Sequence, residues 1–199
     1  MDNNMHYDDI YYLAICNGKN NRLRFNDDDL EDDLEDELYA RGPGVINKVV
    51  DLIIAKPVPR KPVYQDWYSS PRTTVTKKVA DILKEIGQTD NQFFEANIVH
   101  KGETYPDHFM FKCNTELMLM HRERSTFTHE EGLYFIDRLS LDETVLDKIE
   151  EDKRIIMLLD EKAHMVLFHE KVVKALEAAE VTGVRFVKVK DWNVGSAFD

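Results

Sequence analysis

Two stretches of this sequence repeat one pattern at a constant distance of 93 positions, and this repeat limits the fold more than any other feature. The stretches are VTKKVADILKEIGQTDNQFFEAN (75–97) and FHEKVVKALEAAEVTGVRFVKVK (168–190). Identical residues occupy five aligned pairs: Lys78 and Lys171, Val79 and Val172, Leu83 and Leu176, Thr89 and Thr182, and Phe93 and Phe186. Two copies of a helix-then-strand unit would produce this agreement. Chance similarity between two amphipathic segments is the alternative.

Each stretch predicts an amphipathic helix. In residues 74–86 the apolar side chains recur at helical spacing, and Gly87 follows where a helix should stop. These side chains are Val75, Val79, Ile82, Leu83 and Ile86. Residues 170–179 repeat the pattern with Val172, Val173, Leu176 and Ala179, and residues 184–189 return as a strand. We therefore expect both helices to turn one apolar face toward a sheet.

Several other segments have the composition of strands. Residues 7–16 are rich in aromatic and β-branched residues and end at the turn pair Asn17-Gly18. Further strands are predicted at 93–99, 109–113, 117–120 and 133–139, and a hairpin at 155–159 with 165–168. The spacing Ser140-x-x-Glu143 is that of a capping box and predicts a brief helix after it. The expected fold class is α+β, with a mixed or antiparallel sheet covered by helices near 74–86 and 170–180.

The length of 199 residues suits one compact domain. Within it, residues 1–70 hold the first strand, an acidic segment and a connector made extended by Pro57, Pro59 and Pro62. Residues 71–199 hold the α+β region with the repeat. Cys16 and Cys113 have no CxxC partner, so we expect both to be small buried thiols.

The acidic segment is the most unusual part of the composition, since nine of the eleven residues from Asp27 to Glu37 are acidic. Leu30, Leu34 and Leu38 are spaced to lie on one helical face, which favours a short helix held by its leucines, or else a loop. Two roles are open: a solvated run of charge, or a surface that binds a basic cleft on a partner. The candidate partner-binding residues are Asp29, Glu31, Asp32, Asp33, Glu35, Asp36 and Glu37.

The whole chain is acidic as well, with 38 acidic and 26 basic residues and a formal net charge of −12. Such a charge repels nucleic acid and anionic lipid, so direct binding to either is not expected. The chain opens without a basic and apolar leader, and its apolar runs are far shorter than the roughly 18 residues that span a bilayer. We expect a water-soluble, cytoplasmic protein.

No motif for catalysis or for a cofactor is legible. The glycine-rich nucleotide and phosphate loops, the G-x-S-x-G elbow and H-E-x-x-H are all missing from the sequence. His164 and His169, the closest histidine pair, are five residues apart and poorly placed to share a metal. The acidic segment lacks the glycine of a calcium loop. The expectation is no catalytic residue, no metal and no cofactor, and a binding protein instead of an enzyme.

The C-terminal segment HMVLFHEKVVKALEAAEVTGVRFVKV (164–189) resembles a family of bacterial immunity proteins, long known only as a domain of unknown function and encoded beside polymorphic toxins. The resemblance lies in a V-x-x-A-L-E-x-A helix and a T-G-V-x-F turn, and it extends over about residues 70–190. The matching positions are Val172, Ala175, Leu176, Glu177, Ala179, Thr182, Gly183, Val184 and Phe186. The sequence departs from the family at His169, where a serine is usual, and at Val187 and Lys188, where a proline often follows.

The resemblance implies a cytoplasmic protein that binds one cognate toxin and blocks it without chemistry. The toxin of such a pair can be a nuclease with a basic cleft, which the acidic balance would suit. Two alternatives stay open. One is a small enzyme whose site would lie in a cleft with tyrosine, histidine and carboxylate side chains. The other is an acidic adaptor with several basic partners.

Overall fold

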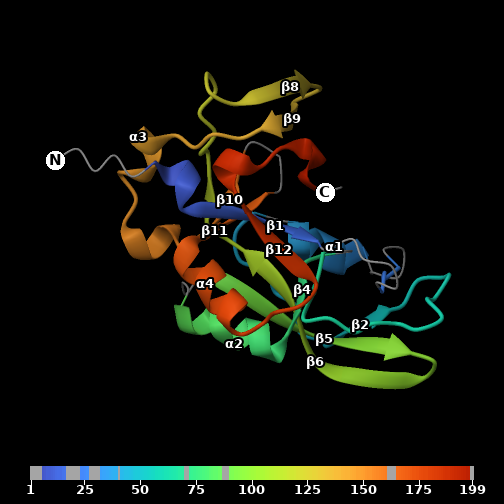
Figure 1. Ribbon diagram of the computed structural model, residues 1–199. Coiled ribbons are helices and arrows are strands. Elements are labelled where there is room, and N and C mark those ends of the chain that lie inside the picture. The colour runs from blue at the N-terminus through green and yellow to red at the C-terminus, as the bar shows by residue number, and fades with distance from the viewer. Residues whose placement is uncertain are drawn as a thin grey trace.

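The computed structural model describes residues 6–16, 23–26, 32–39, 41–69, 72–86, 90–160 and 165–197 (Figure 1). The α-helices are α1 (Asp32–Tyr39), α2 (Lys77–Ile86), α3 (Glu143–Leu146) and α4 (Glu170–Ala178). Short 3-10 helices are η1 (Tyr7–Asp9), η2 (Glu151–Arg154), η3 (Val189–Asp191) and η4 (Val194–Ala197). The strands are β1 (Tyr11–Cys16), β2 (Val50–Ile53), β3 (Trp67–Tyr68), β4 (Thr74–Thr76), β5 (Asn91–His100), β6 (Glu103–Cys113), β7 (Glu116–Leu117), β8 (Thr126–Glu130), β9 (Leu133–Arg138), β10 (Ile156–Leu159), β11 (Val166–His169) and β12 (Val184–Lys188).

In the described residues these strands form two five-stranded sheets and one separate hairpin. The first sheet has the order β12-β1-β11-β10-β7, the second has the order β2-β5-β6-β4-β3, and the hairpin is β8-β9. Both large sheets are mixed, because β7 and β2 join their edges in parallel while the other pairs are antiparallel. The predicted α+β class with mixed or antiparallel sheet is confirmed.

The two repeated stretches have the same topology. β4 runs directly into α2 and is followed by β5, just as β11 runs directly into α4 and is followed by β12. In each sheet one antiparallel strand separates the two strands that flank the helix: β6 in one, β1 in the other. Each unit also begins with a hairpin partner, β3 or β10. The duplicated helix-strand unit predicted from the repeat is therefore present in the topology.

The two units differ in the origin of their inner strand. β6 follows β5 through the two-residue turn Lys101-Gly102, whereas β1 comes from the beginning of the chain. The register of β1 places Leu13 opposite both Val187 and Leu167. The first 70 residues thus supply an inner strand, β1, of one sheet and two strands, β2 and β3, of the other.

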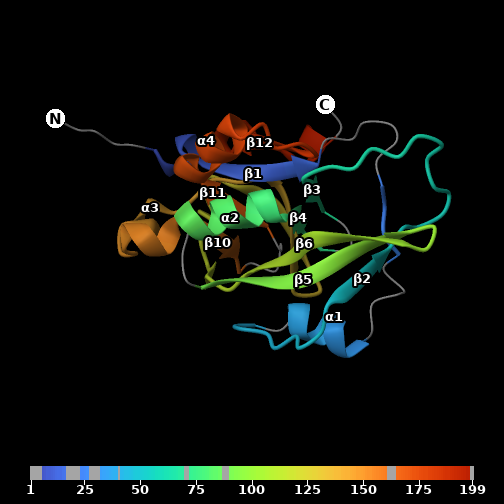
Figure 2. The same cartoon turned by 90° about the horizontal axis from the view of Figure 1, so that it is seen from below.

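The core between the two sheets contains the inward faces of α2 and α4, which pack against each other (Figures 1 and 2). Val79 and Leu83 of α2 lie in it together with their repeat counterparts Val172 and Leu176 of α4, and all four are at most 1% exposed. Along each strand, side chains alternate between this core and the far face of the sheet, because successive side chains of a strand point to opposite faces. The repeat is thus a repeat of core positions.

Two outer cores cover the far faces of the sheets. Leu13, Met157 and Leu167 of the first sheet pack against the segment that carries α3 and the β8-β9 hairpin. On the second sheet the outer core includes Leu34 and Leu38 of α1, each 5% exposed. Figure 2 shows α1 on the side of β5 and β2 that faces away from α2 and α4.

Some local predictions were wrong. The capping box is not formed: α3 begins at Glu143 with Asp142 as its N-cap, and the side chain of Asp142 accepts a hydrogen bond from Thr144 N. Ser140 instead donates to the buried carboxylate of Asp8, at 2.7 Å, because a tertiary acceptor is available to it. Other element bounds also differ: residues 74–76 are strand and not helix, 7–9 are a 3-10 helix, and β8 was not predicted. The predicted stops at Asn17-Gly18 and Gly87 lie outside the described residues.

Candidate functional site

The predicted partner-binding carboxylates are on and before α1. Asp29 and Glu31 lie outside the described residues, while Asp32, Asp33 and Glu35 are part of α1. Asp36 is exposed to solvent and Glu37 is half-buried. The helix forms here because its leucines have a core to enter, which offsets the repulsion between neighbouring carboxylates. The short helix held by Leu34 and Leu38 is thus one of the two structures predicted for this segment.

Glu37 also makes structural contacts. Its Oε2 accepts a hydrogen bond from Val45 N at 2.8 Å, and its backbone carbonyl accepts one from Lys112 Nζ at 2.6 Å. Burial lowers the pKa of Lys112, while the nearby Glu37 opposes that shift. An ammonium group beside the last turn suits the negative end of the helix dipole. These bonds join Val45 to α1 and α1 to β6.

A groove of about 550 Å³ lies between α1 and the segment that leads to β2. The side chains lining it are Leu34, Asp36, Glu37, Val45, Ile46, Asn47 and Lys48. Val45 is 65% exposed, which is a large fraction for an apolar side chain. The groove therefore combines an apolar surface with the described carboxylates of α1. Sequence reasoning identified the carboxylates and missed Val45, although the apolar run 45–55 was the available signal.

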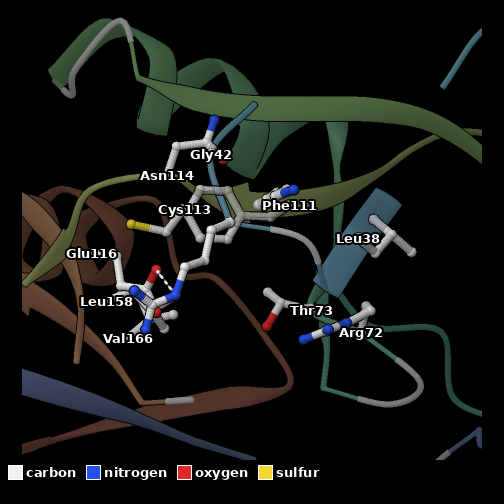
Figure 3. A pocket seen from close by; sticks show the side chains of 12 residues that line it. Leu38, Gly42, Arg72, Thr73, Phe111, Cys113, Asn114, Glu116, Leu158 and Val166 are labelled. Carbon is white, nitrogen blue, oxygen red and sulfur yellow. Dashed lines mark ion pairs between the residues drawn. The ribbon is translucent and has the colours of Figure 1, made fainter. Parts of the chain in front are cut away.

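A small pocket of about 120 Å³ lies at the junction of the two sheets (Figure 3). Glu116, Leu158 and Val166 line one side of it, and Leu38 and Arg72 line the other. Arg41 closes it by an ion pair with Glu116, Nε to Oε2 at 3.5 Å, and by a second ion pair with Asp160. Burial and the neighbouring Asp160 raise the pKa of Glu116, and Arg41 opposes the shift. The pocket is large enough for only a few water molecules. Its role is structural, because the ion pairs of Arg41 join the segment after α1 to the first sheet.

Cys113 lines the same pocket as a free thiol. It is 7% exposed, and burial raises its pKa to about 12. A thiol with this pKa stays protonated at neutral pH and is a poor nucleophile. The prediction of a small buried thiol is confirmed for Cys113, whereas Cys16 is only partly buried.

A charged cleft of about 810 Å³ lies between η1, α3, η2 and the start of α4. Its lining contains tyrosine, histidine and carboxylate side chains: His6, Tyr7, Ile10, Arg124, Glu143, Asp147, Glu151, Arg154, His169, Glu170 and Lys171. These are the residue types that the enzyme alternative requires. They come from five separate parts of the chain, so no sequence motif could have identified the cleft.

The polar groups of the cleft are held by one another. Tyr7 donates to Asp147 Oδ1 at 2.6 Å and accepts from Arg154 at 2.7 Å. Ion pairs join Arg124 to Glu143 and Lys171 to Glu151. In Glu143, hydrogen bonds and charge from Arg124 outweigh burial and leave the pKa lowered; in Glu151, the bond from Lys171 lowers it directly. Carboxylates with lowered pKa are weak general bases at neutral pH.

His169 is the N-cap of α4 and is 8% exposed. Its Nδ1 accepts a hydrogen bond from Lys171 N at 3.2 Å, and its ring meets the Tyr11 ring edge-on at 5.3 Å. Burial lowers the pKa of His169, and the charge of Lys171 lowers it further. The imidazole is therefore neutral at pH 7 and serves as a helix cap, the function that a serine would have at this position.

In the described part of the chain, no three or more histidine, cysteine, aspartate or glutamate side chains are grouped so that they could hold a metal ion. His164, one of the two histidines considered above, lies outside that part. No described helix is both long and apolar enough to cross a membrane. Comparison of the sequence with family models and with curated proteins finds no match.

Proposed function

We propose that this protein is an immunity protein that binds a cognate protein toxin in the cytoplasm and blocks it without chemistry. The observation that carries the proposal is the groove beside α1, where the exposed Val45 and the side chain of Ile46 adjoin a helix rich in carboxylates. An apolar centre with a charged border is the usual anatomy of a protein interface. The sequence resemblance of residues 70–190 points to the same function.

The negative charge of the chain indicates that the proposed partner is basic. The net charge of −12 and the run of nine carboxylates in Asp27 to Glu37 would speed association with a basic protein and would repel nucleic acid. A nuclease toxin must present a basic cleft to its substrate, because phosphate binding depends on lysine and arginine. The proposed partner is therefore a basic toxin, with a nuclease as the leading class.

The charged cleft favours a second candidate, a small enzyme. His169 is its one described histidine with a lowered pKa, and a neutral imidazole can accept a proton. Against this, Nδ1 of His169 already accepts a hydrogen bond, and Glu143, Glu151 and Glu170 all have lowered pKa values with cations beside them. These observations favour a structural role for the cleft over a catalytic one: its ion pairs and hydrogen bonds join η1, α3 and α4.

The test is co-expression with the product of the adjacent gene. We expect that product to be toxic alone, host survival to return when both are made, and a one-to-one complex to co-purify at physiological salt. A neighbouring product that is harmless and forms no complex would contradict the proposal. Similar, salt-sensitive affinity for several unrelated basic proteins would favour the acidic adaptor instead.

The role of α1 is tested with the variant Asp32→Asn/Asp33→Asn/Asp36→Asn/Glu37→Gln. The control removes four carboxylates from exposed positions on other elements: Glu85→Gln/Asp152→Asn/Glu177→Gln/Asp191→Asn. Both variants change the net charge by four, so only a local role of α1 separates them. We expect the α1 variant to bind the toxin at least about tenfold more weakly than the control, with a weaker dependence on salt. Equal affinities would exclude α1 from the interface.

A further inference from the structure

The β8-β9 hairpin, residues 126–138 and hereafter the arm, lies apart from the two large sheets at one end of the molecule (Figure 1). Its turn consists of Glu131 and Gly132, whose φ angles are +50° and +80°. Two residues of positive φ form the tight turn whose twist matches that of the adjoining strands. The arm is therefore a compact ribbon with a defined shape at its tip.

The inner face of the arm is fixed to the outer core of the first sheet. Ile136 is 7% exposed there, and Phe127 and Tyr134 pack against the same core. The ring of Tyr134 lies 5.4 Å from that of Phe127 and is stacked on His129 at 4.4 Å. These contacts hold the ribbon in one orientation, so little further ordering would be needed for it to bind a partner.

The outer face carries two apolar side chains in the open. Leu133 is 45% exposed and Phe135 is 52% exposed, opposite Glu130 and Thr128 of β8. Both belong to the same face, because they are two residues apart on one strand. A rigid, exposed aromatic next to a second apolar side chain is the type of residue that contributes most to binding in protein interfaces.

The negative charges around Leu133 and Phe135 favour a partner with a basic surface. Glu130 and Glu131 lie at the tip and Asp137 lies near the base, and no ion pair within the described residues includes any of them. A second copy of this chain is a poor occupant, since each copy carries a net charge of −12 and the same acidic tip. A basic protein surface would be attracted to the tip and could receive the apolar pair.

We infer that the arm is a second docking element, which inserts Phe135 and Leu133 into an apolar depression bordered by basic side chains on the partner. The inference rests on the proposed function for the identity of that partner, the toxin from the adjacent gene. It does not depend on α1, because the arm and α1 lie on the outer sides of different sheets.

The test measures the binding kinetics of the purified toxin with variants of the full chain. Phe135→Ser is compared with Val63→Ser, which removes an apolar side chain of similar exposure, 49%, from the connector. We expect Phe135→Ser to raise the dissociation constant about 30-fold or more, mainly through faster dissociation, and Val63→Ser to leave it unchanged. Because Phe135 is exposed, thermal unfolding of both variants should match the original protein.

A charge reversal provides a second variant with a structural precedent. Glu131→Lys reproduces the Lys101-Gly102 turn of this same chain, where Lys101 has a φ angle of +54°. It should slow association and flatten its salt dependence without changing stability.

The outcomes separate the two proposals. If the original protein binds the toxin and both arm variants bind equally well, the arm inference is overturned and the proposed function stands. If the original protein does not bind the toxin at all, both fall. A dimer of the original protein in sedimentation that Phe135→Ser dissociates would assign the arm to self-association and would also overturn the inference.

Discussion

Asp66 is a polar side chain that joins the two repeated units, in addition to the core between α2 and α4. Its Oδ2 accepts hydrogen bonds from Thr182 N at 3.0 Å, from Thr182 Oγ1 at 2.9 Å and from Lys78 Nζ at 2.9 Å. Its Oδ1 accepts a further bond from Thr76. Burial raises the pKa of Asp66, but the bonds from Thr182 and Lys78 outweigh burial, so the pKa is lower than usual. One carboxylate thus joins β4 and α2 to the turn after α4.

Replacing Asp66 by asparagine should cost about 1–3 kcal/mol of unfolding free energy at pH 7, because four donor groups lose a charged acceptor. A carboxylate with a lowered folded-state pKa contributes its full stabilisation above the unfolded-state pKa of about 4. That contribution is lost as the pH falls through the folded-state value. Urea unfolding of the original protein and of Asp66→Asn should therefore show a difference that is large at pH 7 and smaller at pH 3.

The matched control is Asp81→Asn. Asp81 pairs with Lys77 one turn away on α2, and both side chains are more than half exposed, at 54% and 58%. An exposed pair of this kind contributes at most about 0.5 kcal/mol. If the two variants lost equal stability, Asp66 would not have the joining role described above.

At the residue scale, sequence reasoning succeeded where a residue's position depends on periodicity. Val79, Leu83, Val172 and Leu176 are buried as predicted, because apolar spacing alone determines which face of a helix turns inward. Polar residues with tertiary partners could not be predicted. The contact of Ser140 with Asp8 joins residues 132 positions apart, and nothing local to either residue encodes it.

At the scale of elements, the structure of the turn from α4 to β12 explains why threonine and glycine occupy positions 182 and 183, within the segment that carries the sequence resemblance. Gly183 has a φ angle of +94°, and a Cβ added there would lie 2.3 Å from the carbonyl oxygen of Trp67. Thr182 supplies the bonds to Asp66 described above. The segment is therefore a structural joint between the repeated units, and its resemblance supports the fold more directly than the function.

Gly183→Ala should be strongly destabilising, and Gly102→Ala provides its control. Gly102 also has a positive φ, +81°, but a Cβ there would meet nothing within 4 Å. The control should lose about 1 kcal/mol through backbone strain alone. Gly183→Ala should lose about 1–3 kcal/mol more through the clash with Trp67. Thermal or urea unfolding of the two variants measures the difference, and equal losses would rule out the close approach.

The element predictions failed mostly where strands are short or polar. β8, with the sequence TFTHE, is exposed at four of its five residues, so it lacks the apolar alternation that marks a strand. It is a strand because β9 pairs with it across a tight turn. The groove beside α1 was likewise only half predicted: the carboxylates were evident from composition, whereas the exposure of Val45 depends on how the chain returns from α1 to β2.

At the scale of the whole molecule, the described chain forms one interlocked body. β1 pairs with β11 on one side and β12 on the other, while β2 and β3 complete the second sheet. The repeat predicted two similar units, and the topology agrees. The sequence did not indicate that one unit takes its inner strand from the beginning of the chain, because β1 has no counterpart in the repeated stretches.

A fragment of residues 71–199 should therefore not fold alone. It would lack β1, the one strand of the described chain that pairs with β12, and it would expose the inward faces of β11 and β12. Circular dichroism and the fluorescence of Trp192 should show no cooperative unfolding transition for the fragment, while the full chain should show one. A sigmoidal transition in the fragment would contradict this interlocked arrangement.

The position of β1 also determines when the first sheet can be completed during synthesis of the chain. Among the described strands, β1 is the first to leave the ribosome and β12 is the last, about 170 residues later. At about 5–20 residues per second, the two are separated by roughly 9 to 34 s of translation. Tyr11 and Leu13 remain without their core during that interval, and a prematurely terminated chain never completes the first sheet. Only a chain translated through β12 can then complete the first sheet.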